Sequence, residues 1–212
     1  MLKTILAELR IHAPFTIFGA LSGIALMWAF RNMPEAMAHR AFYIFHPLHV
    51  VLSALVTSSM YQRYKCHDPR LKCNLFTLLL VGYFGSVGIA TLSDSIIPFL
   101  GETLLDLPNR RMHLGFIDQW YLINPAAVIG VAIGYFWPNT KFPHSGHVLL
   151  STWASLFHVI MALGVAVYWY AYVVICIFLF IAVWLPCCIS DIVFPLLFVG
   201  KEDRKKICPH CT

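Results

Sequence analysis

Long apolar stretches alternate with short polar segments along the whole chain. A helix that crosses a lipid bilayer needs roughly 20 mostly apolar residues. Before residue 140, this pattern predicts four membrane-spanning helices, at 14–30, 42–60, 75–100 and 122–137. No separate soluble domain is expected, because every polar segment between these stretches is short.

The apolar run at 148–199 contains no Lys, Arg or Glu. At about 1.5 Å per residue, it is too long for a single crossing of the bilayer. The run therefore predicts two helices, at 147–168 and 172–199, with a turn near Tyr168–Tyr172, where clustered aromatic residues suit a membrane interface. Together, these stretches predict an all-α integral membrane protein with six transmembrane helices.

The composition agrees with this class of protein. Only 12% of the residues are charged and the mean hydropathy is +0.74, whereas a soluble domain carries about 25% charged residues. The net charge of +5 does not indicate a nucleic-acid partner, because the basic residues lie between apolar stretches. The first stretch follows Lys3 and Arg10 and lacks a small-residue cleavage site, so we expect a retained helix rather than a signal peptide.

Basic residues are divided unequally between the two sides of a six-helix bundle. Six crossings put both termini on one side, and eleven of the 15 Lys and Arg residues lie there. The four on the other side are Arg31, Arg40, Arg110 and Arg111. Because cytoplasmic loops collect Lys and Arg, we expect both termini to be cytoplasmic, in a plasma (inner) membrane.

Three motifs occur twice in the same order and at corresponding ends of the predicted helices. They are P-x4-G-x3-G, H-x-x-H-V-x-L-S and S-D-x-x-x-P-x-L, which begin at Pro14, His46 and Ser93 and again at Pro125, His144 and Ser190. A shared apolar composition explains the matched Val and Leu residues, but it does not explain matched His pairs and matched Ser-Asp pairs. The motifs therefore indicate an internal duplication.

Each copy contains three crossings, so the second copy enters the membrane from the opposite face. We expect a 3+3 inverted-topology repeat, a recurring plan in secondary transporters, with the substrate site at the repeat interface. The chain then divides into a first repeat, an outer interfacial loop, a second repeat and a basic cytoplasmic tail, at 1–100, 101–121, 122–200 and 201–212.

The second helix of each repeat carries polar residues at helical spacing, which places them on one face. Such a stripe is expected to face the interior of a bundle rather than lipid. The two stripes consist of His46, His49, Ser53 and Thr57, and of His144, His147, Ser151, Ser155 and His158. His12 would join the second set. His158 lies deeper, and three roles stay open for it: an additional ligand, a haem ligand or a packing contact.

An intramembrane carboxylate accompanies each stripe. We predict one cluster near each membrane face, formed by His46, His49 and Asp94 and by His144, His147 and Asp191. Imidazole and carboxylate together suit a divalent transition metal such as Zn, Ni, Co, Fe or Mn. Each Asp would be a ligand or an acceptor that orients an imidazole, and His could also relay protons near neutral pH.

The seven cysteines do not form a disulfide pattern. Two pairs are candidates for binding a soft metal or for redox chemistry. These pairs are Cys187 and Cys188, just before Asp191, and Cys208 and Cys211, in the Cys-Pro-His-Cys sequence of the tail.

The function that this pattern favours is a membrane transporter of a divalent transition-metal cation, with proton coupling left open. One alternative is a b-type haem protein that transfers electrons across the membrane. Further alternatives are a zinc-dependent membrane hydrolase and a structural subunit. No motif of a familiar soluble enzyme is present, so we lean away from an enzyme. The expected partners are the lipid bilayer and a small ion, and a homodimer is left open.

Overall fold

The computed structural model describes residues 2–65, 74–138, 141–163, 168–188 and 194–198. Every secondary-structure element in these ranges is helical, which confirms the all-α prediction for this part of the chain. The elements are α1 (Leu2–Ala29), α2 (Glu35–Lys65), α3 (Leu75–Thr91), the π-helical turn η1 (Leu92–Ile96), α4 (Ile97–Leu104), α5 (Gly115–Asp118), α6 (Trp120–Phe136), α7 (Lys141–Ala162), α8 (Trp169–Cys188) and α9 (Phe194–Leu197).

Three helical stretches are long and apolar enough to cross a membrane, which indicates a membrane protein. They are Glu35–Arg63, Leu75–Leu104 and Trp169–Cys187. Three further helices are apolar but shorter, at Thr16–Ala29, Trp120–Phe136 and Gly146–Ala162. The break after α7 comes earlier than the turn expected at Tyr168–Tyr172, because α7 ends at Ala162 and α8 already begins at Trp169.

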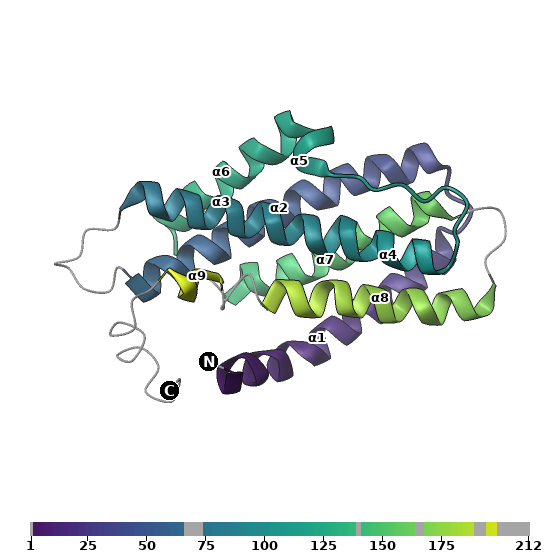
Figure 1. The fold of residues 1–212 in the computed structure, drawn as a ribbon, viewed down its shortest axis with the longest axis horizontal. Coiled ribbons are helices and arrows are strands. Elements are labelled where there is room, and N and C mark those ends of the chain that lie inside the picture. Colours follow the sequence, from purple (N-terminus) through teal and green to yellow (C-terminus); the bar gives the residue numbers. More distant parts are fainter. Residues whose placement is uncertain (1, 66–73, 139–140, 164–167, 189–193, 199–212) are drawn as a thin grey trace.

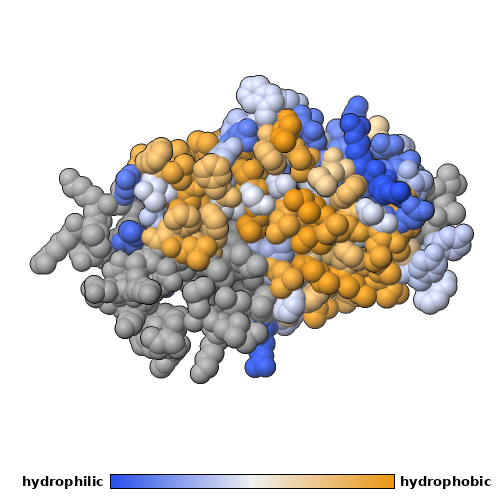
Figure 2. All heavy atoms as spheres, viewed as in Figure 1, coloured by the Kyte–Doolittle hydropathy of each residue, from blue (hydrophilic) through white to orange (hydrophobic). Residues whose placement is uncertain are grey.

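The outer surface of α8 is apolar along its length. Val173, Ile177, Ile181 and Leu185 follow one another at a spacing of four residues and are all exposed. Figure 2 shows apolar side chains over much of the face on which α3, α4 and α8 lie in Figure 1. Exposed apolar surface of this extent is unusual in a soluble monomer, and it suits contact with lipid acyl chains.

The bundle is organised around α2 and α7, which pack against each other along its centre (Figure 1). α6 packs against α2 and α3, and α1 packs against α7 and α8. Glycines permit these close approaches. A Cβ atom on Gly130 of α6 would lie 2.3 Å from the carbonyl oxygen of Val51, and one on Gly19 of α1 would lie 3.0 Å from Oγ1 of Thr152.

The helix expected to end at Leu100 continues to Leu104 through the π-helical turn η1. In this turn, the N–H of Ile97 donates to the carbonyl of Leu92, five residues earlier. Pro98 has no N–H and so cannot donate in the same way to the carbonyl of Ser93. The hydroxyl of Ser155 on α7 donates to that carbonyl instead, at 2.9 Å. Because Pro98 leaves the carbonyl of Ser93 without a donor from its own helix, that carbonyl forms a hydrogen bond to α7 instead.

α2 begins seven residues before the predicted start at residue 42. Glu35 lies in its first turn and Arg63 and Lys65 in its last turn, where their charges complement the helix dipole. The longer helix places His46 and His49 well inside α2 instead of at its beginning. Asp94, expected at a helix end, likewise lies inside the stretch from Leu75 to Leu104.

Candidate metal centre

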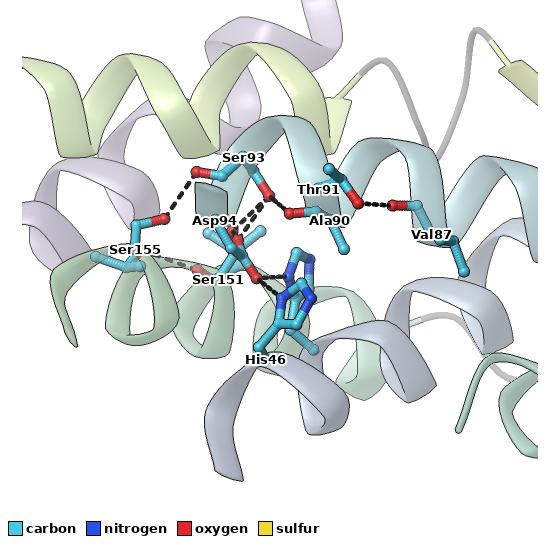
Figure 3. Close-up of polar contacts among 11 residues, drawn as sticks. His46, Val87, Ala90, Thr91, Ser93, Asp94, Ser151 and Ser155 are labelled. Carbon is cyan, nitrogen blue, oxygen red and sulfur yellow. Dashed lines mark hydrogen bonds and ion pairs between the residues drawn. The ribbon is translucent and has the colours of Figure 1, made fainter. Parts of the chain in front are cut away.

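Asp94 lies in the π-helical turn η1 and is fully buried. π-helical turns are rare in proteins, and those that occur are often found at functional sites. Figure 3 shows the Asp94 side chain directed from its helix toward side chains of α2 and α7. A buried carboxylate is costly unless hydrogen bonds or opposite charges compensate it, so its partners determine what the site can bind.

Each carboxylate oxygen of Asp94 has two close partners. Oδ2 lies 2.8 Å from Nδ1 of His46 and 2.7 Å from Nδ1 of His49. Oδ1 accepts hydrogen bonds from the hydroxyls of Ser93, at 2.6 Å, and Ser151, at 2.8 Å (Figure 3). An ionised carboxylate offers about four acceptor positions, and all four are used here. Asp94 is therefore well placed to orient the imidazoles.

This arrangement selects one tautomer for both imidazoles. An ionised carboxylate only accepts hydrogen bonds, so the nitrogen that faces Asp94 carries a proton in both His46 and His49. In the neutral form of either ring, Nε2 is then the nitrogen with a free lone pair, and both Nε2 atoms are buried without a hydrogen-bond partner among the described residues. A metal-binding His almost always donates its other N–H to a carboxylate, a backbone carbonyl or water, and here a carboxylate is in that position.

His49 also belongs to a second group of donors, with His147 of α7 and Cys187 of α8. One donor atom from each of the three residues lies within 4.8 Å of the others, and all three residues are buried. The rings of His49 and His147 are stacked, with centroids 5.8 Å apart. His46, His49 and Asp94 satisfy the same distance criterion. Within the described ranges, His49 is therefore shared by two groups that could hold a metal ion.

One residue of the second predicted cluster, His147, and one predicted lining residue, Ser151, lie at the first cluster. We expected His147 and Ser151 near the opposite membrane face, but His147 stacks on His49 and Ser151 binds Asp94. The reason is the packing of α7 along α2, combined with the position of His46 and His49 inside α2. The four predicted lining residues Ser53, Thr57, Ser151 and Ser155 are also fully buried, as expected for a stripe that faces the bundle interior.

Several predicted site residues lie outside the described part of the chain. Asp191, Cys208 and Cys211 are not described, and neither are the side chains of His12, His144 and Cys188. The second predicted cluster is therefore represented only by His147.

The Nε2 side of His46 faces the start of α5. A Cβ atom on Gly115 would lie 2.6 Å from Nε2 of His46 and 2.7 Å from its Cδ2. The ring of Phe42 stacks on a face of the His46 ring at a centroid distance of 5.0 Å. The absence of a side chain at residue 115 thus leaves the space that the His46 ring occupies.

A second buried carboxylate–imidazole pair was missed by the sequence analysis. Oε1 of Glu102 lies 2.6 Å from Nδ1 of His158, and both residues are buried. This contact uses Nδ1 of His158, and the three roles expected for His158, an additional ligand, a haem ligand or a packing contact, stay predictions. The sequence pattern places Glu102 in the outer loop, because it predicts a helix that ends at Leu100. Glu102 follows Asp94 by eight residues, which is about two helical turns. This spacing is the signal that could have placed Glu102 on the same helix face as Asp94.

Comparisons with known proteins do not supply a family for this chain. No family model matches its sequence, no curated protein is detectably similar to it, and no solved structure matches its fold. The function is therefore inferred from the buried donor groups and from the helices that carry them.

Proposed function

We propose that this protein is a membrane transporter of a divalent transition-metal cation. The observation that carries the proposal is the position of His49 between two buried donor groups, one with His46 and Asp94 and one with His147 and Cys187. Ionisable groups inside membrane helices are costly, and such groups line ion pathways and proton relays in membrane proteins.

The chemistry of the donors suits a borderline or soft divalent cation. Neutral imidazole binds Zn, Ni, Co and Fe, and thiolate adds preference for thiophilic ions. Asp94 supplies a negative charge close to the cation, and its contact with Nδ1 of His49 leaves Nε2 of that ring as the nitrogen that would bind the ion. Nε2 of His49 would be the ligand that the two groups share, with Asp94 behind it as the partner that orients the ring.

The packing of the glycines supports six crossings arranged as an inverted repeat. Gly19 of α1 approaches Thr152 of α7, and Gly130 of α6 approaches Ala54 of α2. The two glycines are 111 residues apart and their two partners are 98 residues apart. These separations equal those between the duplicated motifs. Each half would therefore place its first helix against the second helix of the other half, with the metal centre at the α2–α7 contact.

The donor geometry favours a small ion over a haem group. His46 and His49 lie on one helix and direct Nδ1 to the same oxygen of Asp94. Axial haem ligands must instead face each other across the width of a macrocycle. A lipid hydrolase needs a site open to its substrate, whereas the side chains of both donor groups are buried.

We retain the expected orientation, with cytoplasmic termini in a plasma membrane, as part of the proposal, and a homodimer stays open.

Asp94→Asn tests the proposal. The substitution removes the negative charge and puts an amide donor among four existing donors, so we expect zinc uptake into proteoliposomes to fall at least about 10-fold. The matched control is Asp106→Asn, because Asp106 is an exposed carboxylate paired with Arg110 outside the cluster. Size-exclusion chromatography in detergent would establish that both variants are folded. Zinc uptake by folded Asp94→Asn at the wild-type rate would overturn the proposal.

A further inference from the structure

Glu102 and His158 form a buried pair with few hydrogen bonds. Oε1 of Glu102 lies 2.6 Å from Nδ1 of His158, and the two residues are each only 1% exposed. Oε2 of Glu102 and Nε2 of His158 have no hydrogen-bond partner in the part of the chain that the structure describes. Buried polar atoms almost always have a partner in folded proteins, so two exceptions in one pair require an explanation.

The number of partners distinguishes Glu102 from Asp94. Four close partners compensate an ionised Asp94, whereas His158 is the one side-chain partner of Glu102 among the described residues. With a neutral imidazole, the Glu102–His158 pair would carry a net charge of −1 in the bundle interior, where an uncompensated charge is costly. One additional proton turns the pair into an imidazolium and a carboxylate with no net charge. The pair is therefore suited to hold a proton.

Phe42 lies between this pair and the candidate metal centre. Its ring stacks on that of His46, with centroids 5.0 Å apart, and meets the His158 ring edge-on at 5.5 Å. Phe42 is fully buried, so the two sites are separated by an apolar ring instead of water. Charges interact more strongly across such a medium than across water. A divalent cation in the central cluster would therefore disfavour an imidazolium at His158.

Two further imidazoles extend from the pair toward the surface. The ring of His113, in the segment between α4 and α5, lies 5.4 Å from the His158 ring, centroid to centroid. The ring of His39 on α2 lies 5.8 Å from that of His113. His39 and His113 are partly exposed, whereas His158 is buried. Histidine can pass a proton from one ring nitrogen to the other, and chains of such groups relay protons in membrane proteins. The row therefore offers a route between the pair and water.

The other titratable side chains around the row come from α2, α5, α8 and the segment before α5. Asp118, the one carboxylate among them, lies 4.0 Å from Nδ1 of His113. Within the described residues, none of them forms a hydrogen bond or an ion pair with Glu102 or His158. The charge of the pair is therefore balanced by its own proton. These surrounding residues are His39, Tyr43, Arg111, His113, Asp118, Tyr172 and Cys176.

We propose that Glu102 and His158 form a proton-binding site, and that this site exchanges one proton for the divalent cation of the central cluster. The exchange rests on the proposed function for the identity of the cation. When the cation binds on the other side of Phe42, Nε2 of His158 loses its proton, which passes to water by way of His113. The proton at Nδ1 stays in the hydrogen bond to Glu102. By linkage, a proton at His158 weakens cation binding by the same factor by which the cation weakens proton binding.

The test counts the protons that are released when Zn²⁺ binds to the purified full-length chain in detergent. Isothermal titration calorimetry at neutral pH, in buffers of different ionisation enthalpy, gives this number. We expect Glu102→Gln to release about one proton fewer per Zn²⁺ than the wild type, because a neutral Gln does not balance an imidazolium at His158. Protons released from the central donors contribute equally in both proteins. The matched control is Glu35→Gln, the same substitution at an exposed carboxylate at the start of α2.

The double variant Glu102→Gln/His158→Gln keeps the test informative if Glu102→Gln alone does not fold. Its two amides can form a hydrogen bond with each other and neither titrates, so it should release the same reduced number of protons. Equal proton release by the wild type and the variants would overturn the proton site, whether or not the protein transports zinc. Zinc uptake into proteoliposomes tests transport separately. If uptake is absent and the variants release fewer protons, the proton site stands and the transporter proposal fails.

Discussion

The hydroxyl of Ser151 donates a hydrogen bond to Oδ1 of Asp94 across 2.8 Å. Ser151 and Asp94 come from opposite halves of the chain, on α7 and η1. Asp94 is buried and has four close partners, of which Ser151 is the only one from the second half of the chain. Without Ser151, one acceptor position of the carboxylate would have no donor. The candidate metal centre therefore depends on the packing of the two halves against each other.

Gly115→Ala should impair metal binding without unfolding the protein. The new Cβ would lie 2.6 Å from Nε2 of His46, so the imidazole must move. No described glycine has a positive φ, and the backbone at residue 115 therefore accepts alanine without strain. We expect the affinity for Zn²⁺, measured by isothermal titration calorimetry, to fall roughly 10-fold. Ile117→Ala, at an exposed position on the same short helix, is the control. Equal affinities in the two variants would show that His46 does not contribute.

Cys187→Ser should change the preference among ions more than the total affinity. A hydroxyl is a poor ligand for thiophilic ions and is tolerated by hard ions. We expect binding of Cd²⁺ to weaken at least about 10-fold, while binding of Mn²⁺ stays within about 2-fold of the wild type. Competition titrations against a chromophoric chelator measure both. Cys176→Ser is the control on the same helix, because Cys176 packs against the apolar core instead of the donor group. A uniform change for both ions would argue against thiolate ligation.

Gly130→Ala should destabilise the contact between α6 and α2. The added Cβ would lie 2.3 Å from the carbonyl oxygen of Val51, which is backbone and cannot rotate away. Overpacking of this kind costs about 1–3 kcal/mol, so the midpoint of thermal unfolding in detergent should fall. Gly88→Ala is the control, because a Cβ added there would meet no atom of the described residues within 4 Å. An unchanged midpoint in Gly130→Ala would mean that α6 does not approach α2 this closely.

Acid should destabilise the folded protein through His113. The pKa of His113 is lowered to about 4 in the folded state, mainly by burial, and an unfolded His titrates near 6.5. Between these values the unfolded chain binds more protons, so the free energy of unfolding falls as pH drops from about 6.5 to about 4. Above this window His113 contributes no pH dependence. Thermal unfolding with a metal chelator present would measure the effect.

His113→Gln is the matched variant for this pH dependence. It should flatten the unfolding profile between about pH 6.5 and pH 4, because Gln does not titrate. Identical profiles for the wild type and the variant would contradict the lowered pKa. The chelator separates this effect from metal release, which also responds to pH because protons compete for the imidazole ligands.

The sequence by itself determined that the chain is helical and suited to a membrane, and it identified polar residues that turn out to be buried together. Apolar length and the shortage of charge require helices, since a backbone surrounded by hydrocarbon must satisfy its hydrogen bonds internally. Helical spacing placed His46 and His49 on one face, and the cost of burying a carboxylate made Asp94 a candidate for the same site. These inferences are local, which is why they needed no knowledge of the packing.

Only the tertiary structure decided which polar groups meet. The start of α2 at Glu35 and the continuation of the third helical stretch to Leu104 set the height of each side chain along the bundle. A shift of one helical turn, about 5.4 Å, separates or joins two imidazoles. The stacking of His147 on His49 and the pairing of Glu102 with His158 therefore follow from the packing of α7 against α2 and α4, because contacts between residues distant in sequence depend on how whole helices dock.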